Sequence, residues 1–415
     1  MKVIIISMLG LVPVLAQAQV GIGTTNPLAG LHVTDSSVLF SAAGAAVTTT
    51  ATPISGDGRR MMWYAPKAAF RAGYLDAGGG SFWDASNIGN YSFAAGTNTR
   101  ASGTSSFAAG NNTTASGNES VAMGSYSIAS ALASVALNGQ ATDTGAVAIG
   151  SGAIAAGDQA MALGQNAVAY GFGSVSIGPS TSSGIFSVAI GVSNRASNWY
   201  SFALGRTARS NHNGSFVLGD GSAGFTSDSV YSSANNQMSM RFVGGYRLFT
   251  NLNLTSGIAL SPGGGSWSSL SDRRKKENFQ TLDREEILTK VAALPLTSWN
   301  YKSQPATQRH IGPMAQDFYA AFQLDGIGND TTINTVDIDG VNMAAIQALE
   351  IRSRKLSAEN EALKSRVEQL EAELRHTTEA SAATHKRLVE IERLLLKAYP
   401  GDRAAVAAAR QGPLE

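Results

Sequence analysis

Cysteine is absent from this 415-residue chain, and both aromatic residues (7%) and charged residues (15%) are scarce. Without cysteine the chain can form no disulfide, no thiol-based active site and no thiolate metal site. The five histidines show no spacing typical of metal ligands, so we expect neither a metal nor another cofactor. A formal net charge of +1 gives no electrostatic reason to expect nucleic acid as a partner.

Long hydrophobic runs are also rare, and the clearest one lies at the N-terminus. It has the three parts of a secretory signal: Lys2 at the start, an apolar stretch over residues 3–15, and the small-residue sequence Ala16-Gln17-Ala18. This stretch is too short to cross a hydrocarbon layer of roughly 30 Å comfortably. We therefore expect residues 1–18 to be removed on export and the mature chain to have no membrane span.

The scarce charge is distributed unevenly along the chain. Residues 1–268 contain 11 Lys or Arg and 9 Asp or Glu, whereas residues 269–415 contain 20 and 21. The first part is rich in Gly, Ala, Ser and Thr, which suits a thin repetitive β structure better than one large packed core. The second part has the charge content and the apolar spacing of helices. The length and this change predict more than one domain.

Glycine is abundant, with 45 residues, and over residues 91–219 it marks a repeat. The unit is Ser-Φ-Ala-Φ-Gly, where Φ is apolar in most copies, as in SVAMG at 120–124 and SVAIG at 187–191. Its closing position is Asn at 138 and Gly at 96, 110, 124, 150, 164, 178, 191, 205 and 219. The steps are 14 residues long, except for one of 12 from 138 to 150 and one of 13 from 178 to 191.

A short fixed period with Gly at a corner is typical of a solenoid. Fourteen residues can form two strands of about five residues, at ~3.3 Å per residue, and two tight turns. Alternation within the unit places the two Φ residues on one face and Ser and Ala on the other. Because one coil cannot bury its own apolar face, the coils must stack, and a further chain can cover the face that remains.

Other patterns follow the repeat. Short strands between Gly turns are predicted at 238–241, 244–250 and 257–260. From residue 271 the pattern is helical, with Asp283 as a candidate helix cap. A second helix is expected from Pro313 to Phe322, closed by a Gly-rich loop at 326–328.

The C-terminal region contains a heptad repeat. Residues 337–340 are expected to form a turn, and apolar residues at a and d positions then continue from 346 to 398. Asn360 at an a position would fix the register at some cost in stability. The chain is thus predicted to be mainly β, with an α-helical C-terminus that includes a coiled coil.

Ser271 stands at the change of composition, in the sequence LSDRRKK at 270–276. A Ser hydroxyl becomes a nucleophile when a base takes its proton, and a Lys can do so where burial or neighbouring positive charge lowers its pKa. Lys275 would face Ser271 on a helix, whereas Lys276 reaches it only through a bend or from another chain. The simpler interpretation is a helix N-cap followed by solvated basic residues. Spacing alone does not decide between these alternatives.

The Ser-Val-Ala-Ile-Gly repeats resemble the head domain of trimeric autotransporter adhesins. That resemblance implies a left-handed parallel β-roll in which three chains pack side by side, with an adhesive use. The ligand stays open between a host surface and a glycan, and no concave carbohydrate site can be read from the sequence.

Three motifs in the last third of the chain resemble the S74 peptidase domain, the intramolecular chaperone of phage endosialidase tailspikes. They are SDRRKKENF at 271–279, HIGPMAQ at 310–316 and DIDG at 337–340. The resemblance implies a domain that trimerises the fibre ahead of it and then cuts the chain before the motif Ser. It makes Leu270–Ser271 the scissile bond, Ser271 the nucleophile and Lys276 the base. His310 is then a candidate supporting residue.

We therefore expect an exported homotrimeric fibre or adhesin-like protein, secreted or held at a bacterial cell surface, that cleaves itself once as a Ser-Lys endopeptidase. The alternative is a non-enzymatic surface adhesin with a permanent C-terminal trimerisation module. The expected segments are a signal peptide (1–18), an N-terminal β segment (19–90), β-roll repeats (91–219), a β neck (220–268), the chaperone domain (269–375, coiled coil from 346) and a helical tail (376–415).

Overall fold

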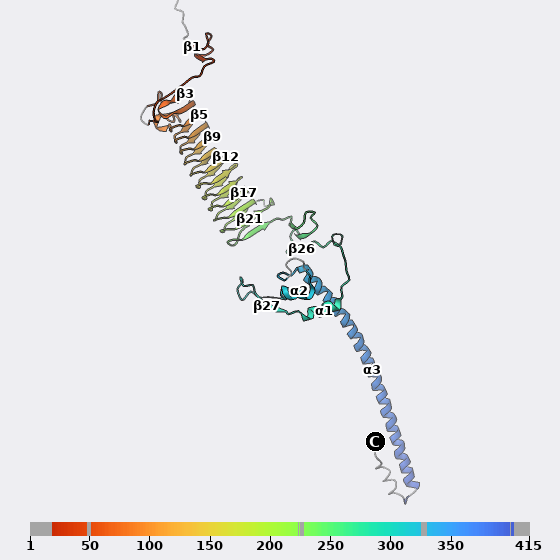
Figure 1. Cartoon of the computed structure of the whole chain (residues 1–415). Coiled ribbons are helices and arrows are strands. Elements are labelled where there is room, and N and C mark those ends of the chain that lie inside the picture. The colour runs from red at the N-terminus through yellow and green to blue at the C-terminus, as the bar shows by residue number, and fades with distance from the viewer. Residues whose placement is uncertain are drawn as a thin grey trace, which may run out of the picture. The chain divides into compact units, whose positions relative to one another are not determined.

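The computed structural model describes residues 19–47, 51–222, 224, 228–324, 330–398 and 400–401. The expected signal segment and the expected loop at 326–328 lie outside the described residues. The chain divides into two compact units, residues 1–248 with 259–267 and residues 249–258 with 268–415 (Figure 1).

A parallel β solenoid dominates the first unit, which confirms the prediction from the repeat (Figure 1). Among the described residues, 21 strands join into one continuous sheet. Successive coils lie in register, so that Val121 pairs with Val135 and Val135 with Val147. The repeated unit forms the longer strand of each coil, and the rest of the coil contains a strand of two or three residues.

The longer strands are β5 (Phe93–Thr97), β7 (Phe107–Asn111), β9 (Val121–Ser125), β13 (Met161–Leu163), β15 (Val175–Ile177), β17 (Val188–Val192), β19 (Phe202–Arg206), β21 (Phe216–Gly219) and β23 (Met238–Arg241). The shorter strands are β6 (Arg100–Ala101), β8 (Thr114–Ala115), β10 (Ile128–Ala129), β14 (Val168–Ala169), β16 (Thr181–Ser182), β18 (Arg195–Ala196), β20 (Ala208–Ser210) and β22 (Val230–Tyr231). In two coils a single strand runs through both parts: β11 (Val135–Ala141) and β12 (Val147–Ala155). The ladder thus continues to Arg241, beyond the end of the sequence period at 219.

Each residue type of the repeated unit has its own role in the coil. The Ser is buried, and in most copies its hydroxyl donates to the carbonyl oxygen three residues earlier, as from Ser120 Oγ to Gly117 O at 2.6 Å. The Ala points inward, and columns of fully buried Ala form the core. The Gly adopts a positive φ and stacks closely, so a Cβ added at Gly110 would overlap the carbonyl oxygen of Gly124.

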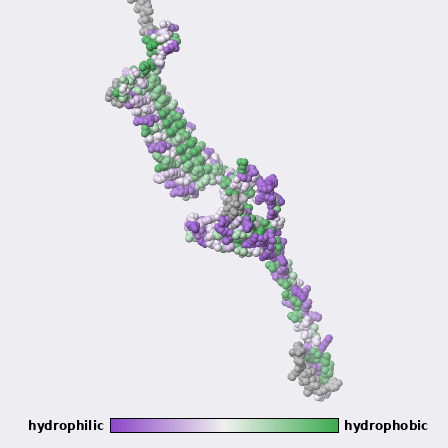
Figure 2. All heavy atoms as spheres, in the orientation of Figure 1, coloured by the Kyte–Doolittle hydropathy of each residue, from purple (hydrophilic) through white to green (hydrophobic). Residues whose placement is uncertain are grey.

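The two Φ residues point outward and stay partly exposed. Figure 2 shows hydrophobic residues gathered in a continuous band along the solenoid. Aromatic rings stack along this band, with centroids 5.4 Å apart for Phe70 and Phe93 and 4.9 Å apart for Phe93 and Phe107. The alternation predicted from the sequence is confirmed, and the apolar side of every coil is left for another surface to cover.

A hairpin of larger residues closes the N-terminal end of the solenoid. Strands β3 (Gly58–Tyr64) and β4 (Ala69–Leu75) pair in antiparallel fashion, and β4 then pairs in parallel with β5. Two 3-10 turns, η1 (Ala65–Lys67) and η2 (Ala85–Asn87), follow β3 and β4. The core here contains Met62, Tyr64, Ala69, Leu75, Trp83 and Ile88.

Arg71, a residue of β4 in this hairpin, is fully buried. Its guanidinium donates to Phe70 O at 2.8 Å, Ser92 O at 3.0 Å, Ser92 Oγ at 2.8 Å and Ala101 O at 2.9 Å. Burial lowers the pKa of Arg71 to about 10, which leaves the group charged at neutral pH. The guanidinium therefore bonds to carbonyl oxygens at the N-terminal end of the solenoid, and two of these, Ser92 O and Ala101 O, also accept from backbone N–H groups.

Two small sheets lie in the chain before and after the solenoid. Strands β1 (Val20–Ile22) and β2 (Leu31–Val33) form a parallel pair. Strands β24 (Tyr246–Phe249), β25 (Gly257–Leu260) and β26 (Ser268–Ser269) form a three-stranded sheet, in agreement with the strands predicted for this region.

Helices dominate the second unit. Helix α1 (Arg284–Ala293) begins at the predicted cap, where the Asp283 carboxylate accepts from the backbone N–H groups of Glu285 and Glu286, both at 3.0 Å. Strands β27 (Thr297–Trp299) and β28 (His310–Gly312) pair in antiparallel fashion and precede helix α2 (Ala315–Phe322).

The last helix, α3 (Thr335–Ala398), is longer than expected. The turn predicted at 337–340 was wrong, because these residues lie in the first turns of α3. The side chain of Asn334 accepts from the backbone N–H of Val336 at 2.9 Å and starts the helix there. Asp337 in the first turn then interacts favourably with the helix dipole.

Among the described residues, helix α3 is covered near its start, where Leu288 of α1 packs against Ala345 and Ala348. Further along, apolar a and d residues are exposed: Ile346, Leu349, Leu356, Leu363, Val367, Leu370, Leu374, Leu388, Ile391 and Leu395. An exposed heptad row predicts association with further helices. No helix in the described part of the chain has the length and hydropathy that crossing a bilayer requires.

Candidate active site

Ser271 lies two residues after the last strand of the three-stranded sheet, and the chain there enters a tight turn. The backbone N–H of Leu270 donates to Gly257 O at 3.1 Å, which holds the residue before Ser271 against β25. Asp272 then caps the 3-10 turn η4 (Arg273–Lys275), its carboxylate accepting from the backbone N–H of Arg274 at 3.0 Å. Lys276 ends the turn in an extended conformation.

The turn brings the side chain of Lys276 back to Ser271. The amine Nζ lies 2.7 Å from the hydroxyl Oγ and donates a hydrogen bond to it. Among the described residues, Lys276 and not Lys275 makes this contact. The bend that a separation of five residues requires is thus present within one chain.

Asp272 organises the basic residues around this pair, and the sequence analysis did not single it out. Its carboxylate accepts from Arg274 Nη2 at 2.9 Å and Nε at 3.2 Å. These side-chain bonds, the backbone bond from Arg274 and the charge of Lys275 hold the pKa of Asp272 below its ordinary value. The signal was available, because Asp is a preferred residue immediately before a helical turn.

The ring of Phe279 contacts another basic side chain of the motif, that of Arg273. The guanidinium of Arg273 lies 5.1 Å from the centre of the Phe279 ring, a cation–π arrangement. Arg273 and Arg274 are therefore both held by neighbours other than Ser271, and Lys276 is the basic residue directed at the hydroxyl.

The arrangement provides the two groups that a Ser-Lys nucleophile needs. An ammonium donates to the hydroxyl, as the described hydrogen bond does, whereas a neutral amine can accept the hydroxyl proton. Lysine is neutral near pH 7 only where burial or neighbouring positive charge favours that form. Both Ser271 and Lys276 are exposed in the single chain.

His310 lies in β28 within an aromatic group. Its ring centre is 4.8 Å from that of Trp299 and 5.8 Å from that of Tyr301, and Nε2 is 3.0 Å from Gln304 Oε1. None of these contacts of the described residues involves Ser271 or Lys276, so a supporting role for His310 stays a prediction. In the part of the chain that the structure describes, no three His, Asp or Glu residues come together as a metal site would require.

The comparison with protein families finds a match in each of the two parts of the chain. Residues 271–326 match the peptidase S74 family, described as the chaperone of endosialidase. Residues 88–113, 115–137, 155–181 and 182–208 match the YadA head domain repeat. No curated protein matches the chain. The chain therefore carries YadA head repeats ahead of an endosialidase-type chaperone module that begins at the candidate nucleophile.

Proposed function

We propose that this chain is an exported fibre protein of the adhesin type, in which the chaperone module assembles three copies and then cuts its own backbone at Leu270–Ser271. The observation that carries the proposal is the 2.7 Å hydrogen bond between Lys276 Nζ and Ser271 Oγ at the first residues of the matched chaperone module.

Two exposed apolar surfaces support assembly. The solenoid leaves the Φ residues of every coil partly exposed, and α3 leaves its a and d residues exposed over most of its length. Each surface has the periodicity of the element that carries it, so copies of the same chain can cover it in register. Homotrimerisation would bury both surfaces together.

The proposed reaction uses the residue before the nucleophile. Lys276 takes the proton of the Ser271 hydroxyl, and Oγ attacks the carbonyl carbon of Leu270. The C–N bond breaks as the proton passes to the released amine of Ser271, leaving an ester between Leu270 and Oγ. Water then hydrolyses the ester to give a Leu270 carboxylate and a free Ser271 hydroxyl.

Assembly supplies the cover over Lys276 that the single chain lacks. Because Ser271 and Lys276 are exposed in one copy, the amine needs a cover that favours its neutral form. Neighbouring copies in a trimer provide such a cover, so cleavage follows assembly. Release of residues 271–415 then removes the assembly device and traps the trimer kinetically.

The test is the mass of the mature wild-type protein. Denaturing mass spectrometry is expected to show two chains divided between residues 270 and 271, with the N-terminal chain starting after Ala18. Light scattering of the native head is expected to give three times the mass of one chain. A monomeric head, or an intact chain in assembled protein, would contradict the assembly step or the cleavage step respectively.

The exposure of Ser271 and Lys276 also favours the second candidate, a surface adhesin with a permanent trimerisation module. In that case the mass of the assembled chain stays that of the uncut protein, and the assembled state still has three copies. The same two measurements therefore decide between the candidates.

Asp272 is expected to act as a positioning residue in cleavage. Asp272→Ala removes the cap of η4 and lets the Lys276 side chain move away from Ser271, so the cleavage rate should fall about fivefold. Asp272→Asn is the matched control, because Asn also caps, and should keep most of the rate. Quantifying cleaved chain over time on a denaturing gel measures both, and equal rates for Ala and wild type would exclude the role.

The contribution of Asp272 has a defined pH dependence. Because hydrogen bonds from Arg274 lower the pKa of this carboxyl group, its stabilising effect is present above the ordinary pKa of Asp. It is lost as the pH falls through the lowered pKa. The ratio of wild-type to Asp272→Ala rates should therefore stay constant between pH 6 and 9.

A further inference from the structure

One corner of the solenoid is two residues shorter than its neighbours. From the longer to the shorter strand, Val121 to Ile128 spans seven positions, and so does Val147 to Ile154. In the coil between them, Val135 and Gln140 occupy the same register positions and lie five positions apart. The 12-residue step therefore removes two residues from this corner and leaves the strands in register.

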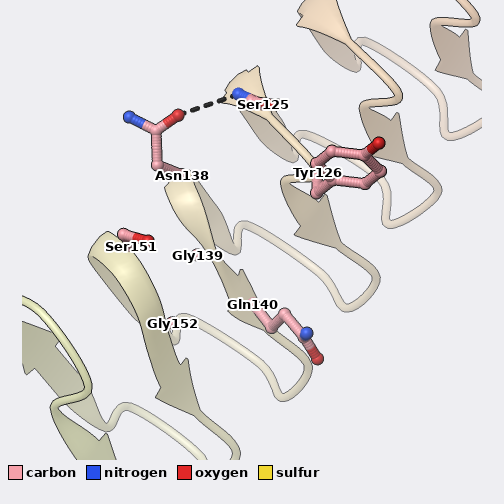
Figure 3. Close-up of a pocket in the computed structure, with 7 residues that line it drawn as sticks. All are labelled: Ser125, Tyr126, Asn138, Gly139, Gln140, Ser151 and Gly152. Carbon is pink, nitrogen blue, oxygen red and sulfur yellow. Dashed lines mark hydrogen bonds between the residues drawn. The ribbon is translucent and has the colours of Figure 1, made fainter.

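The missing residues leave a notch with a volume of about 310 Å³. Its lining comes from three successive coils (Figure 3): Ser125, Tyr126, Asn138, Gly139, Gln140, Ser151 and Gly152. Gly139 is buried, whereas Tyr126, Asn138, Gln140 and Ser151 are exposed. In the neighbouring coils, the left-handed residues Tyr126 and Gly152 follow the closing Gly by two positions, whereas in the short coil the closing residue Asn138 is itself left-handed, with a φ of 55°. The volume is at the lower end of the range for small-ligand sites.

The lining is polar, uncharged and aromatic on one side. The Tyr126 side chain is 71% exposed. Asn138 Oδ1 accepts from the backbone N–H of Ser125 at 2.8 Å, which orients the amide so that its NH₂ group extends outward, as Figure 3 shows. The side chains of Gln140 and Ser151 add further groups that both donate and accept hydrogen bonds.

We infer that this notch binds a neutral pyranose unit of a glycan. Sugar hydroxyls both donate and accept hydrogen bonds, as do the amides and hydroxyls of the lining, and an exposed tyrosine ring offers a flat apolar face with a polar tip. The lining contains no charged residue to balance an anionic sugar. The site gives the adhesive part of the proposed function a ligand class, and rests on that part and not on self-cleavage.

Two further observations distinguish this corner from the other corners of the solenoid. The matches to the YadA head repeat stop at residue 137 and resume at 155, so the short coil is where the chain departs from the repeat. The residues that line the notch also lie at a corner, and none of them occupies the outward second or fourth position of the repeated unit. A partner that covers the apolar band therefore need not close the notch.

The test is saturation-transfer NMR on the mature wild-type protein with four neutral probes: methyl glucoside, methyl galactoside, methyl mannoside and N-acetylglucosamine. At least one probe is expected to bind, and N-acetylneuraminic acid, which is anionic, is expected not to. Tyr126→Ala should weaken the binding about tenfold, because it removes the aromatic face.

A second variant fills the notch without truncating a ring. Asn138→Gly with Ser-Tyr inserted after it rebuilds the corner Gly-Ser-Tyr found at 124–126, and should abolish binding while the protein keeps its thermal stability. Tyr91→Ala is the matched control, because Tyr91 has a similar φ of 58° against 54° for Tyr126 and is 58% exposed. Binding should persist in this control.

The proposal is overturned if no neutral probe binds, if the anionic sugar binds equally well, or if the filled variant or Tyr126→Ala binds as wild type does. Loss of binding in Tyr91→Ala would also overturn it. The mass and light-scattering measurements on the same samples report cleavage and assembly separately, so failure of the notch is distinguishable from failure of the proposed function.

Discussion

Replacing Ser271 with Ala is expected to leave the chain uncut. The hydroxyl is the atom that attacks Leu270 in the proposed reaction, and Ala provides no replacement for it. Cleavage over hours should fall below detection, a loss of at least about 100-fold, as expected when a nucleophile or its base is removed. Denaturing mass spectrometry of assembled protein measures the outcome directly.

Lys276→Gln is expected to have the same effect as Ser271→Ala, because Gln can hold a hydrogen bond to Oγ but cannot take its proton. Lys275→Gln is the matched control, since it removes one positive charge from the adjacent residue. This control should still be cut at Leu270–Ser271. Efficient cleavage in Ser271→Ala would refute the assigned nucleophile, and an uncut Lys275→Gln with a cut Lys276→Gln would transfer the base to Lys275.

The second large effect is expected in the solenoid. Gly110→Ala places a methyl group where the carbonyl oxygen of Gly124 lies, at a backbone φ of 124° that L-residues rarely adopt. The coils can relieve the overlap only by separating, which breaks the ladder between β7 and β9. We expect a loss of more than about 4 kcal/mol in the free energy of unfolding. Circular dichroism during heating measures the change.

Gly145→Ala is the matched control for this substitution. Gly145 also has a positive φ, of 62°, but the nearest atom to an added Cβ is Gln159 Cγ at 3.7 Å. Ala133 occupies the equivalent corner one coil earlier at φ 54°. The cost should therefore be limited to about 1 kcal/mol of backbone strain. If both variants unfold alike, close stacking at Gly110 is not what constrains the coil.

The sequence predicted the solenoid well because every coil repeats the same small residues at the same spacing. Periodicity shows which side chains point inward, and it allowed the Ala and Ser core to be assigned without a structure. It did not predict the N-terminal hairpin, because residues 58–75 carry no repeat and the burial of Arg71 depends on carbonyl groups 21 and 30 residues further along the chain.

The candidate site was only partly predictable for a similar reason. Spacing alone left Lys275 and Lys276 open, since the choice depends on the turn that Asp272 caps. The short coil was visible as a 12-residue step, but a step does not say which corner lost the residues. Only the register of the strands on both sides reveals that the loss opens a notch.

The buried Arg71 has a consequence for how heads behave in concentrated solution. The last strand of an open solenoid is a template on which another molecule can add its own first coil, and so start a filament. At the N-terminal end, the guanidinium adds hydrogen bonds to Ser92 O and Ala101 O, which also accept from backbone N–H groups, and an antiparallel hairpin replaces the next parallel strand. A parallel coil of another head therefore meets an antiparallel strand at this end and not a continuation of the ladder, which disfavours polymerisation of heads through it.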